Sequence, residues 1–376
     1  MKLLIASGGG GHFSPALAVI EKLPKDWSFL VVGRKYPFEG EKTLSLEYQT
    51  AKKLGIPFQS LTTGRLQRRF TRHTILSLFK IPYGLTQALF ILKRYKPDAV
   101  LSFGGYVAVP VCMAAKILSI PIVIHEQTLG AGLATKITAK LADKICISWG
   151  KSEKYFPASK TVLTGNPIRE FQISNFKLLP AGKAGPTLND RKMIYVTGGS
   201  GGAHAVNTLV EGALEKLLEK YIVIHQTGDA REFGDFERLE KFKEALPKEL
   251  RERYITMKFV DPSLVFKFLK EADLVISRSG VNTVTELLSF GKPCLLIPLP
   301  YGQHNEQLQN ALFVQEVGLG EVVDQQSLTS EKLYEKVVEM FTSLGKYKAH
   351  AEEAKRLVDV DAAEKIIKVV NSVVRN

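Results

Sequence analysis

Cysteine is scarce in this sequence, and its few copies lack the spacing of a functional cluster. The 376 residues include only Cys112, Cys146 and Cys294, each inside a separate apolar run. Disulfide frameworks and zinc sites need Cys or His residues at short, defined spacings. The sequence therefore excludes a disulfide scaffold and predicts buried thiols in a reducing compartment.

Long apolar runs are missing as well. A membrane-spanning helix needs about 20 consecutive, mainly apolar residues. The run PVCMAAKILSIPIVI, residues 110–124, is interrupted by Lys116 and a second proline. The opening MKLLIASGGGG enters a strand pattern directly, without the charged and long apolar segments of a signal peptide. We expect no secretion signal, and we expect any membrane contact to be peripheral.

Negative charge is absent from one long segment. Residues 48–97 contain no Asp or Glu but ten basic residues, against a net charge of +13 for the whole chain. They are Lys52, Lys53, Arg65, Arg68, Arg69, Arg72, Lys80, Lys93, Arg94 and Lys96. Apolar residues are interleaved with them (LSLFKIPYGLTQALFIL), as at an anionic membrane surface, where each basic residue contributes about 1 kcal/mol. A core helix with a solvated basic face fits the same pattern. Nucleic-acid binding is disfavoured because no recognisable nucleic-acid module accompanies the charge.

The length and the hydrophobic pattern indicate two α/β domains. At about 100 to 200 residues per domain, the chain is long enough for two. Short β-branched runs alternate with helical patterns, which is typical of βαβ units in a parallel sheet. The first set of strands reads LLIAS, FLVVG, AVLSF, IVIHE and KICIS, and the second reads MIYVTG, IVIHQT, ITMKFV, LVISRSG and CLLIPLP. Residues 173–190, rich in Gly and Pro, lie between the sets and predict an irregular connection.

Each set of strands begins with a glycine-rich turn into a helix. The first turn, SGGGGHFSP at residues 7–15, allows close backbone approach to a ligand and precedes a helix N-terminus, which favours anions. A nicotinamide dinucleotide fingerprint is disfavoured, because Phe13 occupies its third glycine position and the second strand ends VVGRK without an acid. A lone histidine is often a structural core residue. However, His12 follows the turn at the carboxyl edge of the sheet, where such folds bind ligands.

The second turn, GGSGG at residues 198–202, has two interpretations. Its glycines suit a phosphate-binding turn. It also matches the G-x-S-x-G nucleophile elbow, so a serine hydrolase with Ser200 as nucleophile and His304 as the histidine is the main rival.

Polar residues gather after four further strands. Residues 273–320 bring Arg278, Ser279 and Gly280 to a loop, then Thr283 and Glu286 to a helix, where an acid can accept hydrogen bonds from both ribose hydroxyls. The amide-rich stretch PYGQHNEQLQNALFV follows and fits a reader of sugar hydroxyls, although helix capping explains part of it. LSFGGY (101–106), IHEQTLGAGL (124–133) and TGNPIR (164–169) add further polar groups, so the sequence predicts a ligand cleft between the domains. Zinc is unsupported, because the HE of IHEQ has no second histidine four residues on.

In combination and in this order, these motifs resemble the MurG family of glycosyltransferases, family 28. The match carries GGGGHFSPALAV, FGGYVAVP, IHEQ, TGNPIR, GGSGGA, SRSG with TELLSFGKP, and the loop ending QLQNAL. The resemblance implies a GT-B fold: an α/β protein of two facing Rossmann-like domains with parallel sheets and an interdomain cleft. The implied domains are 1–165, completed by the C-terminal helix at about 350–376, and 166–349.

The resemblance also implies an activity. The family moves N-acetylglucosamine with inversion from UDP-N-acetylglucosamine to the MurNAc 4-hydroxyl of undecaprenyl-pyrophosphoryl-MurNAc-pentapeptide, converting lipid I to lipid II. The implied partners are this UDP-sugar donor, the polyprenyl-pyrophosphate-linked acceptor and an anionic membrane surface, at the cytoplasmic face of the cell membrane. No cofactor is implied and no metal is strictly required.

The family's functional residues can be placed on matching positions. Val260 resembles the residue that meets uracil, Glu286 the ribose-binding acid, Ser200 the diphosphate-binding turn and Gln307 the reader of the donor sugar. His12 is the candidate general base. The implied donor-binding set is Gly10, Gly11, His12, Thr128, Arg169, Ser200, Val260, Ser279, Gly280, Thr283, Glu286 and Gln307. The implied acceptor-binding set is Gly104, Gly105, Tyr106, His125, Glu126 and Gln127.

Four positions depart from the family pattern. Thr128 replaces the usual Asn after HEQ, Gly201 and His204 replace Gln and Arg after GGS, and Glu306 precedes Gln307 where an amide is usual. These departures leave open a GT-B enzyme that makes a different glycolipid. A membrane-bound sensor that binds UDP-sugar without turnover is a further alternative.

Overall fold

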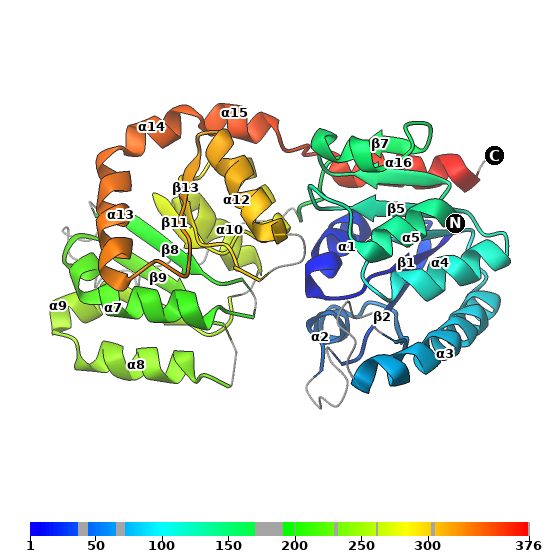
Figure 1. The fold of residues 1–376 in the computed structure, drawn as a ribbon, viewed down its shortest axis with the longest axis horizontal. Helices are drawn as coiled ribbons and strands as arrows, with labels where there is room; N and C mark the ends of the chain where they lie inside the picture. Colours follow the sequence, from blue (N-terminus) through cyan, green and yellow to red (C-terminus); the bar gives the residue numbers. More distant parts are fainter. Residues whose placement is uncertain are drawn as a thin grey trace. The chain divides into compact units, whose positions relative to one another are not determined.

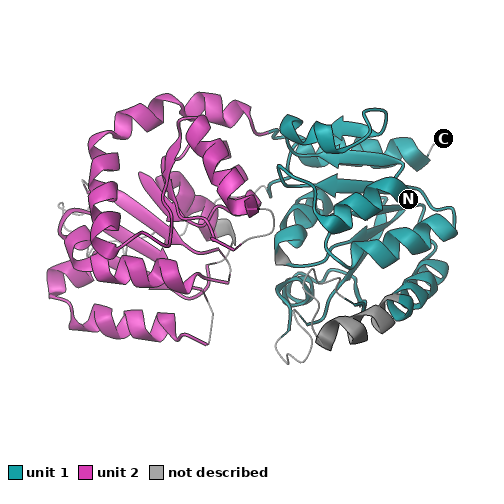
Figure 2. Ribbon diagram, in the orientation of Figure 1, with its two compact units in different colours: residues 1–169, 359–376 teal, residues 170–358 magenta. Residues whose placement is uncertain are grey.

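The structure, a computed structural model, describes residues 1–36, 44–64, 72–169, 191–199, 201–228, 232–260, 262–301 and 305–374. The chain forms two compact units (Figure 2). Unit 1 comprises residues 1–169 and 359–376, and unit 2 comprises residues 170–358. Each unit is built on a parallel sheet covered by helices, the architecture that the alternating pattern predicts.

Unit 1 has a seven-stranded sheet of order β3-β2-β1-β4-β5-β6-β7 (Figure 1). Its strands are β1 (Lys2–Ala6), β2 (Ser28–Gly33), β3 (Phe58–Ser60), β4 (Ala99–Ser102), β5 (Ile122–Glu126), β6 (Lys144–Ile147) and β7 (Thr161–Leu163). Ala6 is paired with Val32 on one side and with Ser102 on the other. The turns that follow β1, β2 and β4 therefore emerge together at the carboxyl edge, where the strand order reverses and open α/β sheets bind ligands.

Both faces of this sheet are buried. The helices are α1 (Gly10–Lys22), α2 (Leu46–Lys53), α3 (Arg72–Tyr95), α4 (Ala108–Ile117), α5 (Leu133–Leu141), the 3-10 helix η1 (Gly150–Tyr155) and α16 (Ala362–Val374). Leu4 and Ala6 pack on the face covered by α3 and α4, whereas Leu3 and Ile5 pack on the face covered by α1 and α16. This alternation follows from the two-residue period of a strand.

Unit 2 has a six-stranded sheet of order β10-β9-β8-β11-β12-β13. Its strands are β8 (Met193–Thr197), β9 (Ile222–Gln226), β10 (Tyr254–Met257), β11 (Leu274–Ser277), β12 (Cys294–Leu296) and β13 (Gly320–Val322). Its helices are α7 (His204–Lys220), α8 (Asp235–Ala245), α9 (Lys248–Arg251), α10 (Pro262–Glu271), α11 (Val281–Phe290), α12 (Glu306–Glu316), α13 (Ser330–Thr342), α14 (Leu344–Ala349) and α15 (Ala351–Arg356). β8 lies at the centre, so unit 2 repeats the switch-point geometry of unit 1.

The chain returns to unit 1 at its C-terminal end. α15 packs against α11 of unit 2, whereas α16 packs against α1 and lies across β4, β5 and β6 (Figure 1). The crossing lies at Val358–Asp359, later than the expected position near residue 350. The predicted irregular connection at 173–190 lies outside the described residues. None of the described helices is long and apolar enough to cross a membrane.

Candidate functional site

In unit 1, two glycine turns pack backbone against backbone. The Gly8 N–H donates to the Gly104 carbonyl at 3.1 Å, and a Cβ added to Gly105 would lie 2.5 Å from the Gly8 carbonyl oxygen. Gly9, Gly104 and Gly105 have φ angles of 128°, 95° and 76°, which favour glycine. The two turns therefore present backbone rather than side chains at the carboxyl edge of β1 and β4.

The helices that follow the candidate turns have open N-termini. α1, α4, α7 and α11 have no acidic residue in their first turn and no side-chain cap. In contrast, α2 and α13 have both: Ser45 and Thr329 accept from backbone N–H groups, and Glu47 and Glu331 follow. Backbone N–H groups and helix dipoles are thus left available to an anion where the candidate sites lie.

His12 lies at the junction of the two glycine turns of unit 1. Its half-buried ring is close enough to Gly104 that a Cβ there would lie 3.4 Å from Cε1, and its Nδ1 lies 3.1 Å from Nε2 of Gln127. Burial lowers the pKa of His12 to about 4, the Phe103 carbonyl opposes this shift, and the Arg34 guanidinium lowers the pKa further. The imidazole is therefore neutral at pH 7.

Arg34 is a site residue that the sequence reasoning did not select. It follows β2 and donates from one guanidinium nitrogen to the Tyr106 hydroxyl at 2.7 Å, with its guanidinium carbon 4.6 Å from the centre of the Tyr106 ring. A Cβ added to Gly9 would lie 2.9 Å from another of its nitrogens. The available signal was VVGRK, which places a cation where a dinucleotide fold has its acid. Arg34 thus adds positive charge beside the first turn and orients Tyr106.

His125, Glu126 and Gln127, which the resemblance assigns to the acceptor, are held by contacts inside unit 1. Their side chains are buried, with relative exposures of 2%, 5% and 2%. His125 Nε2 lies 3.0 Å from the Gly165 carbonyl oxygen, so it donates within unit 1, and burial lowers its pKa to about 4. Glu126 accepts from the Thr128 backbone N–H at 2.9 Å. These contacts hold loops of unit 1 in place, and acceptor binding by the three residues stays a prediction.

Thr128 and Arg169 also have partners within unit 1. The Thr128 hydroxyl lies 2.8 Å from a Glu126 carboxylate oxygen and 2.7 Å from the Gly130 carbonyl oxygen. Arg169 donates from Nε to Glu21 on α1 at 2.6 Å. Both side chains are therefore oriented by contacts inside the unit. Among the described residues, no group of three or more His, Cys, Asp or Glu side chains is placed to hold a metal ion.

In unit 2, the second glycine turn is tied to the end of the next strand. The Gly199 N–H donates to the Thr197 hydroxyl at 3.0 Å, and Gly202 has a φ of 77°. A Cβ added to Gly202 would collide with the Thr227 carbonyl oxygen. Ser200 lies outside the described residues, as do Gln303 and His304. The described part of the turn is therefore packed closely against the ends of β8 and β9, and phosphate binding by it stays a prediction.

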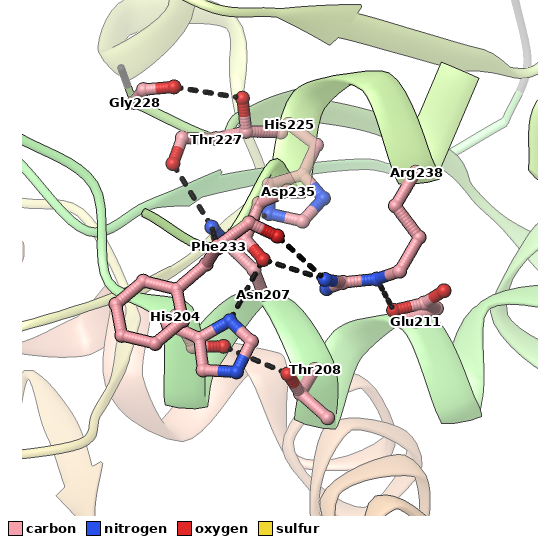
Figure 3. Close-up of polar contacts among 10 residues, drawn as sticks. All are labelled: His204, Asn207, Thr208, Glu211, His225, Thr227, Gly228, Phe233, Asp235 and Arg238. Carbon is pink, nitrogen blue, oxygen red and sulfur yellow. Dashed lines mark hydrogen bonds and ion pairs between the residues drawn. The ribbon is translucent and has the colours of Figure 1, made fainter. Parts of the chain in front are cut away.

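A buried polar network supports this turn (Figure 3). Asn207 on α7 donates from Nδ2 to Asp235 at 2.7 Å and to the Thr227 carbonyl at 2.9 Å, so its Oδ1 faces His225 Nε2, 3.0 Å away. His225 Nε2 must therefore donate, and Nδ1 accepts from the Tyr254 hydroxyl at 3.0 Å. Burial lowers the pKa of His225 to about 3, so the ring is neutral. This network fixes α7, β9, β10 and α8 relative to one another.

His204 joins the same network at its surface. Its Nδ1 lies 2.7 Å from Asp235, and its ring stacks on Phe233 with centroids 4.1 Å apart (Figure 3). Burial is the largest single influence on the pKa of Asp235 and raises it. The hydrogen bonds from Asn207, His204 and Arg238 together outweigh burial, so the pKa is lowered. The sequence had identified His204 only as a departure from the family pattern. Its ring is oriented by Asp235, which the sequence did not single out.

The loop after β11 is closed by hydrogen bonds to α12. Ser279 donates to the Gln307 carbonyl at 2.7 Å, and Asn310 donates to the Ser279 carbonyl at 3.0 Å. The Gln307 side chain accepts from the Leu299 N–H at 3.0 Å. Arg278 is buried and donates to the Ile297 carbonyl, so it supports the loop. The structure therefore brings Ser279, Gly280 and Gln307 together at one edge of the unit 2 sheet.

Glu286 lies on α11 in an environment that disfavours its charge. Burial raises the pKa of Glu286 to about 7. Its charge in turn raises the pKa of Tyr195, although burial of Tyr195 is the larger cause. Thr283 is one turn earlier on α11, and Val260 is buried after β10. A carboxyl group held in a poorly solvated position is a candidate ligand-binding group.

The glycines of the second turn allow a matched test. We expect Gly202→Ala to lower Tm and weaken UDP binding, because the added Cβ meets the Thr227 carbonyl and non-glycine residues at positive φ cost about 1 to 3 kcal/mol. Gly201→Ala is the control for Tm alone, since a Cβ there meets nothing within 4 Å but the residue belongs to the same turn. Differential scanning fluorimetry and calorimetry measure both effects. Equal behaviour of the two variants would contradict the close packing of the turn.

Comparison with protein families gives two adjoining matches. Residues 3–147 match the glycosyltransferase family 28 N-terminal domain, and residues 193–366 match the glycosyltransferase family 28 C-terminal domain. The two matches together cover both sheets, apart from the short edge strand β7.

Individual proteins similar to this chain point to the same family. The chain is 33% identical over 377 residues to a protein of Geotalea uraniireducens and 34% identical over 374 residues to one of Geobacter sulfurreducens, in each case covering 98% of this chain and 97% of the relative. Both relatives are named "UDP-N-acetylglucosamine--N-acetylmuramyl-(pentapeptide) pyrophosphoryl-undecaprenol N-acetylglucosamine transferase". The crystal structure of Acinetobacter baumannii MurG is similar, with a TM-score of 0.71 and 26% identity over 99% of this chain and 100% of that one. A Neisseria meningitidis UDP-GlcNAc 2-epimerase shares the fold alone, at 15% identity, 99% and 100% coverage, and a TM-score of 0.63.

Proposed function

The chain belongs to glycosyltransferase family 28, and on this premise we propose that it transfers N-acetylglucosamine from UDP-N-acetylglucosamine to N-acetylmuramyl-(pentapeptide) pyrophosphoryl-undecaprenol. This is the reaction for which its relatives are named. The observation that carries the proposal is the similarity to these relatives over 98% of the chain, which includes both glycine turns. The product is the disaccharide-linked lipid, lipid II.

Unit 2 is the proposed donor site. Glu286 accepts hydrogen bonds from the ribose hydroxyls, Val260 contacts uracil, and Gln307 reads the sugar. The glycine turn with Ser200 and the N-terminus of α11, with Ser279, Gly280 and Thr283, bind the diphosphate through backbone N–H groups. Support comes from the open N-termini of α7 and α11 and from the raised pKa of Glu286, a group that gains partners when ribose binds. Arg169 and Thr128 remain proposed donor contacts.

Unit 1 is the proposed acceptor site. Gly10 and Gly11 at the start of α1, and the turn Gly104–Gly105 with Tyr106, face the acceptor diphosphate, and Arg34 supplies positive charge. The acceptor 4-hydroxyl oxygen attacks the anomeric carbon of the donor sugar and releases its proton to water, the bond to UDP breaks with its electron pair leaving on the UDP oxygen, and the configuration inverts. His12 is the proposed catalytic residue. Backbone N–H groups at helix N-termini stabilise the leaving diphosphate, so the proposal requires no metal.

The direct test is product analysis with purified lipid I and UDP-N-acetylglucosamine. We expect the disaccharide lipid as the product and no turnover with UDP-glucose at the same concentration. Transfer to another polyprenyl or glycolipid acceptor in preference to lipid I would favour a different glycolipid enzyme. UDP-sugar binding without turnover on any lipid would contradict the enzymatic proposal.

The outer face of α3 is the proposed membrane contact, at the cytoplasmic face of the cell membrane. Tyr83 and Phe90 are 57% and 63% exposed, and Lys93 and Arg94 are exposed beside them. A cavity of about 480 Å³ next to Phe90 is lined by Arg94, Gln87 and Leu30 among others, a mixture that suits an amphiphile. Of the other basic residues in this segment, Arg65, Arg68 and Arg69 lie outside the described residues, and the side chains of Arg72 and Lys80 are not described.

Neutralising this face tests the contact. We expect the double variant Lys93→Gln/Arg94→Gln to bind anionic phosphatidylglycerol vesicles about 30-fold more weakly, at about 1 kcal/mol per residue, and wild-type binding to weaken as salt increases. The control is Lys25→Gln/Lys368→Gln, since these exposed lysines follow α1 and lie on α16, the helices on the other face of the sheet. Vesicle sedimentation measures both. Equal losses in the two double variants would contradict a specific contact through α3.

A further inference from the structure

Gln127 is placed to decide which nitrogen of His12 carries the proton. It ends the run IHEQ after β5, and its side chain is 2% exposed. Its Nε2 lies 3.2 Å from the Phe103 carbonyl oxygen and 3.1 Å from His12 Nδ1. The Gln127 backbone carbonyl accepts from the Trp149 indole N–H at 2.9 Å, which holds the residue in position. The Gln127 side-chain amide therefore contacts both the Phe103 carbonyl and the His12 ring.

The orientation of this amide follows from chemistry. A backbone carbonyl oxygen only accepts hydrogen bonds, so the Gln127 atom that faces Phe103 must be the nitrogen. The reverse orientation would place the amide oxygen against the carbonyl oxygen. An amide NH₂ group has two donors and no acceptor. His12 Nδ1 must therefore accept from Gln127, and the single proton of the neutral ring then lies on Nε2.

The surroundings of His12 favour this neutral form. Burial is the largest cause of its lowered pKa of about 4, the Phe103 carbonyl opposes this shift, and the Arg34 guanidinium lowers the pKa further. The neighbouring His125 has a pKa lowered to about 4 and is neutral as well. Glu126, the nearest carboxyl along the chain, is turned to the Thr128 N–H and hydroxyl. Among the described groups, no carboxylate is hydrogen-bonded to His12 to pull a proton onto Nδ1.

The free edge of the ring faces the glycine turns. Positions for a Cβ on Gly9 and on Gly104 lie 4.0 Å from Cδ2 and 3.4 Å from Cε1 of His12. Nε2 is the ring atom between these two carbons. The N–H on Nε2 is thus directed to the same space as the backbone of the anion-binding turn.

We propose that Gln127 is a positioning residue that holds His12 as an Nε2–H donor, so that His12 stabilises an anionic phosphate oxygen of the acceptor rather than removing a proton. The proposal rests on the proposed function, because it concerns how His12 acts in that transfer. It replaces the general-base role expected from the sequence, since a base needs its lone pair on the nitrogen that faces the substrate. The role fits the cation Arg34 beside the same turn.

Substitutions at His12 distinguish a role as hydrogen-bond donor from a role as general base. A glutamine side chain places an amide N–H near the position of Nε2 but accepts no proton at neutral pH. We expect His12→Gln to retain kcat/KM for the lipid acceptor within about tenfold of the wild type, whereas His12→Ala loses about 100-fold. His12→Asn, whose amide reaches only the position of Nδ1, should resemble alanine. A His12→Gln variant as slow as His12→Ala would overturn the proposal in favour of a base.

Changing Gln127 tests the positioning role directly. In Gln127→Glu, a carboxylate accepts from Nδ1–H, so the proton moves to Nδ1 and the pKa of His12 rises. We expect kcat to fall and the pH profile to gain an ionisation that is absent in the wild type. Gln315→Glu, at an exposed glutamine near the end of α12, is the control for added charge. An unchanged or increased kcat in Gln127→Glu would contradict the donor role.

Nitrogen-15 NMR of the full-length protein, labelled on histidine, reports the tautomer without any substrate. The His12 signals are assigned as those lost in His12→Gln. We expect a proton on Nε2 in the wild type and on Nδ1 in Gln127→Glu, with the other histidines unchanged. A wild-type proton on Nδ1 would overturn the proposal. Because this measurement needs no acceptor, it stays decisive even if transfer to lipid I fails and the proposed function falls.

Discussion

Replacing His12 with alanine is expected to lower kcat/KM for the lipid acceptor about 100-fold while the Kd for UDP stays unchanged. His12 lies on the glycine turn of unit 1, whereas the groups proposed to bind UDP most directly, Glu286 and the turn at residues 198–202, belong to unit 2. The loss should therefore fall on the transfer step and leave nucleotide binding intact. Single-turnover product analysis and calorimetry with UDP measure the two quantities separately.

Two outcomes would contradict this expectation. A loss of less than about tenfold would mean that His12 does not contact the acceptor. A parallel loss of UDP affinity would mean that His12 serves the donor, as its place in the implied donor-binding set allows. The circular dichroism spectrum and Tm of the variant provide the control for folding, because the ring also packs against Gly104 and Gln127.

Replacing Glu286 with glutamine is expected to raise the Kd for UDP by about 10- to 100-fold. Hydrogen bonds to a charged group are worth about 1.5 to 3 kcal/mol, and glutamine keeps only a weaker, neutral acceptor. The effect should disappear for a uridine diphosphate analogue that lacks both ribose hydroxyls. Equal loss of affinity for UDP and for the analogue would show that Glu286 does not read the ribose.

The pH dependence of UDP binding follows from the same carboxyl group. Burial raises its pKa from 4.5 to about 7, so it is half protonated near neutral pH in the free protein. The ribose hydroxyls donate to the ionised form and therefore favour it, so UDP affinity should rise as pH increases through 7. In Glu286→Gln, this part of the pH dependence should be lost. Calorimetry in buffers of different ionisation enthalpy detects the proton released on binding.

The free energy of unfolding should fall as pH increases, whereas UDP affinity should rise. The pKa of Glu286 is higher in the folded than in the unfolded state, so the folded protein binds more protons between pH 4.5 and about 7. The contribution of this group to the free energy of unfolding is therefore greatest below pH 4.5 and is lost as pH rises to about 7. Glu286→Gln removes this loss and should raise Tm at pH 8 by a few degrees. A lower Tm at pH 8 would contradict the buried position of this carboxyl group.

The sequence predicted the main strands because both faces of a parallel sheet are buried. Each of the ten runs read as strands corresponds to a strand of the structure, from Lys2–Ala6 to Cys294–Leu296. The three short edge strands β3, β7 and β13 were not predicted. Residues such as Phe58–Ser60 and Thr161–Leu163 are only partly buried, so they have no continuous apolar run to distinguish them from loops.

The sequence predicted the parts of the site that depend only on neighbouring residues in the chain. Glycines that permit positive φ and helices that begin without acidic residues are visible in GGGGH and GGSGGA, because they depend on neighbours along the chain. Arg34, Asp235 and the buried state of His125, Glu126 and Gln127 were not visible. Each depends on residues far away in the sequence, as when Gln127 meets His12 and Phe103.

The sequence by itself determined the family, the two parallel-sheet units and the carboxyl edges where the glycine turns lie, because these follow from hydrophobic period and backbone conformation. Only the tertiary structure decided that α16 returns to α1, that Arg34 stands beside the first turn, and that Gln127 directs its amide to His12. A hydrogen bond depends on two atoms within about 3 Å of each other. For residues 115 positions apart, that distance is set by the packing of the whole sheet and not by any local pattern.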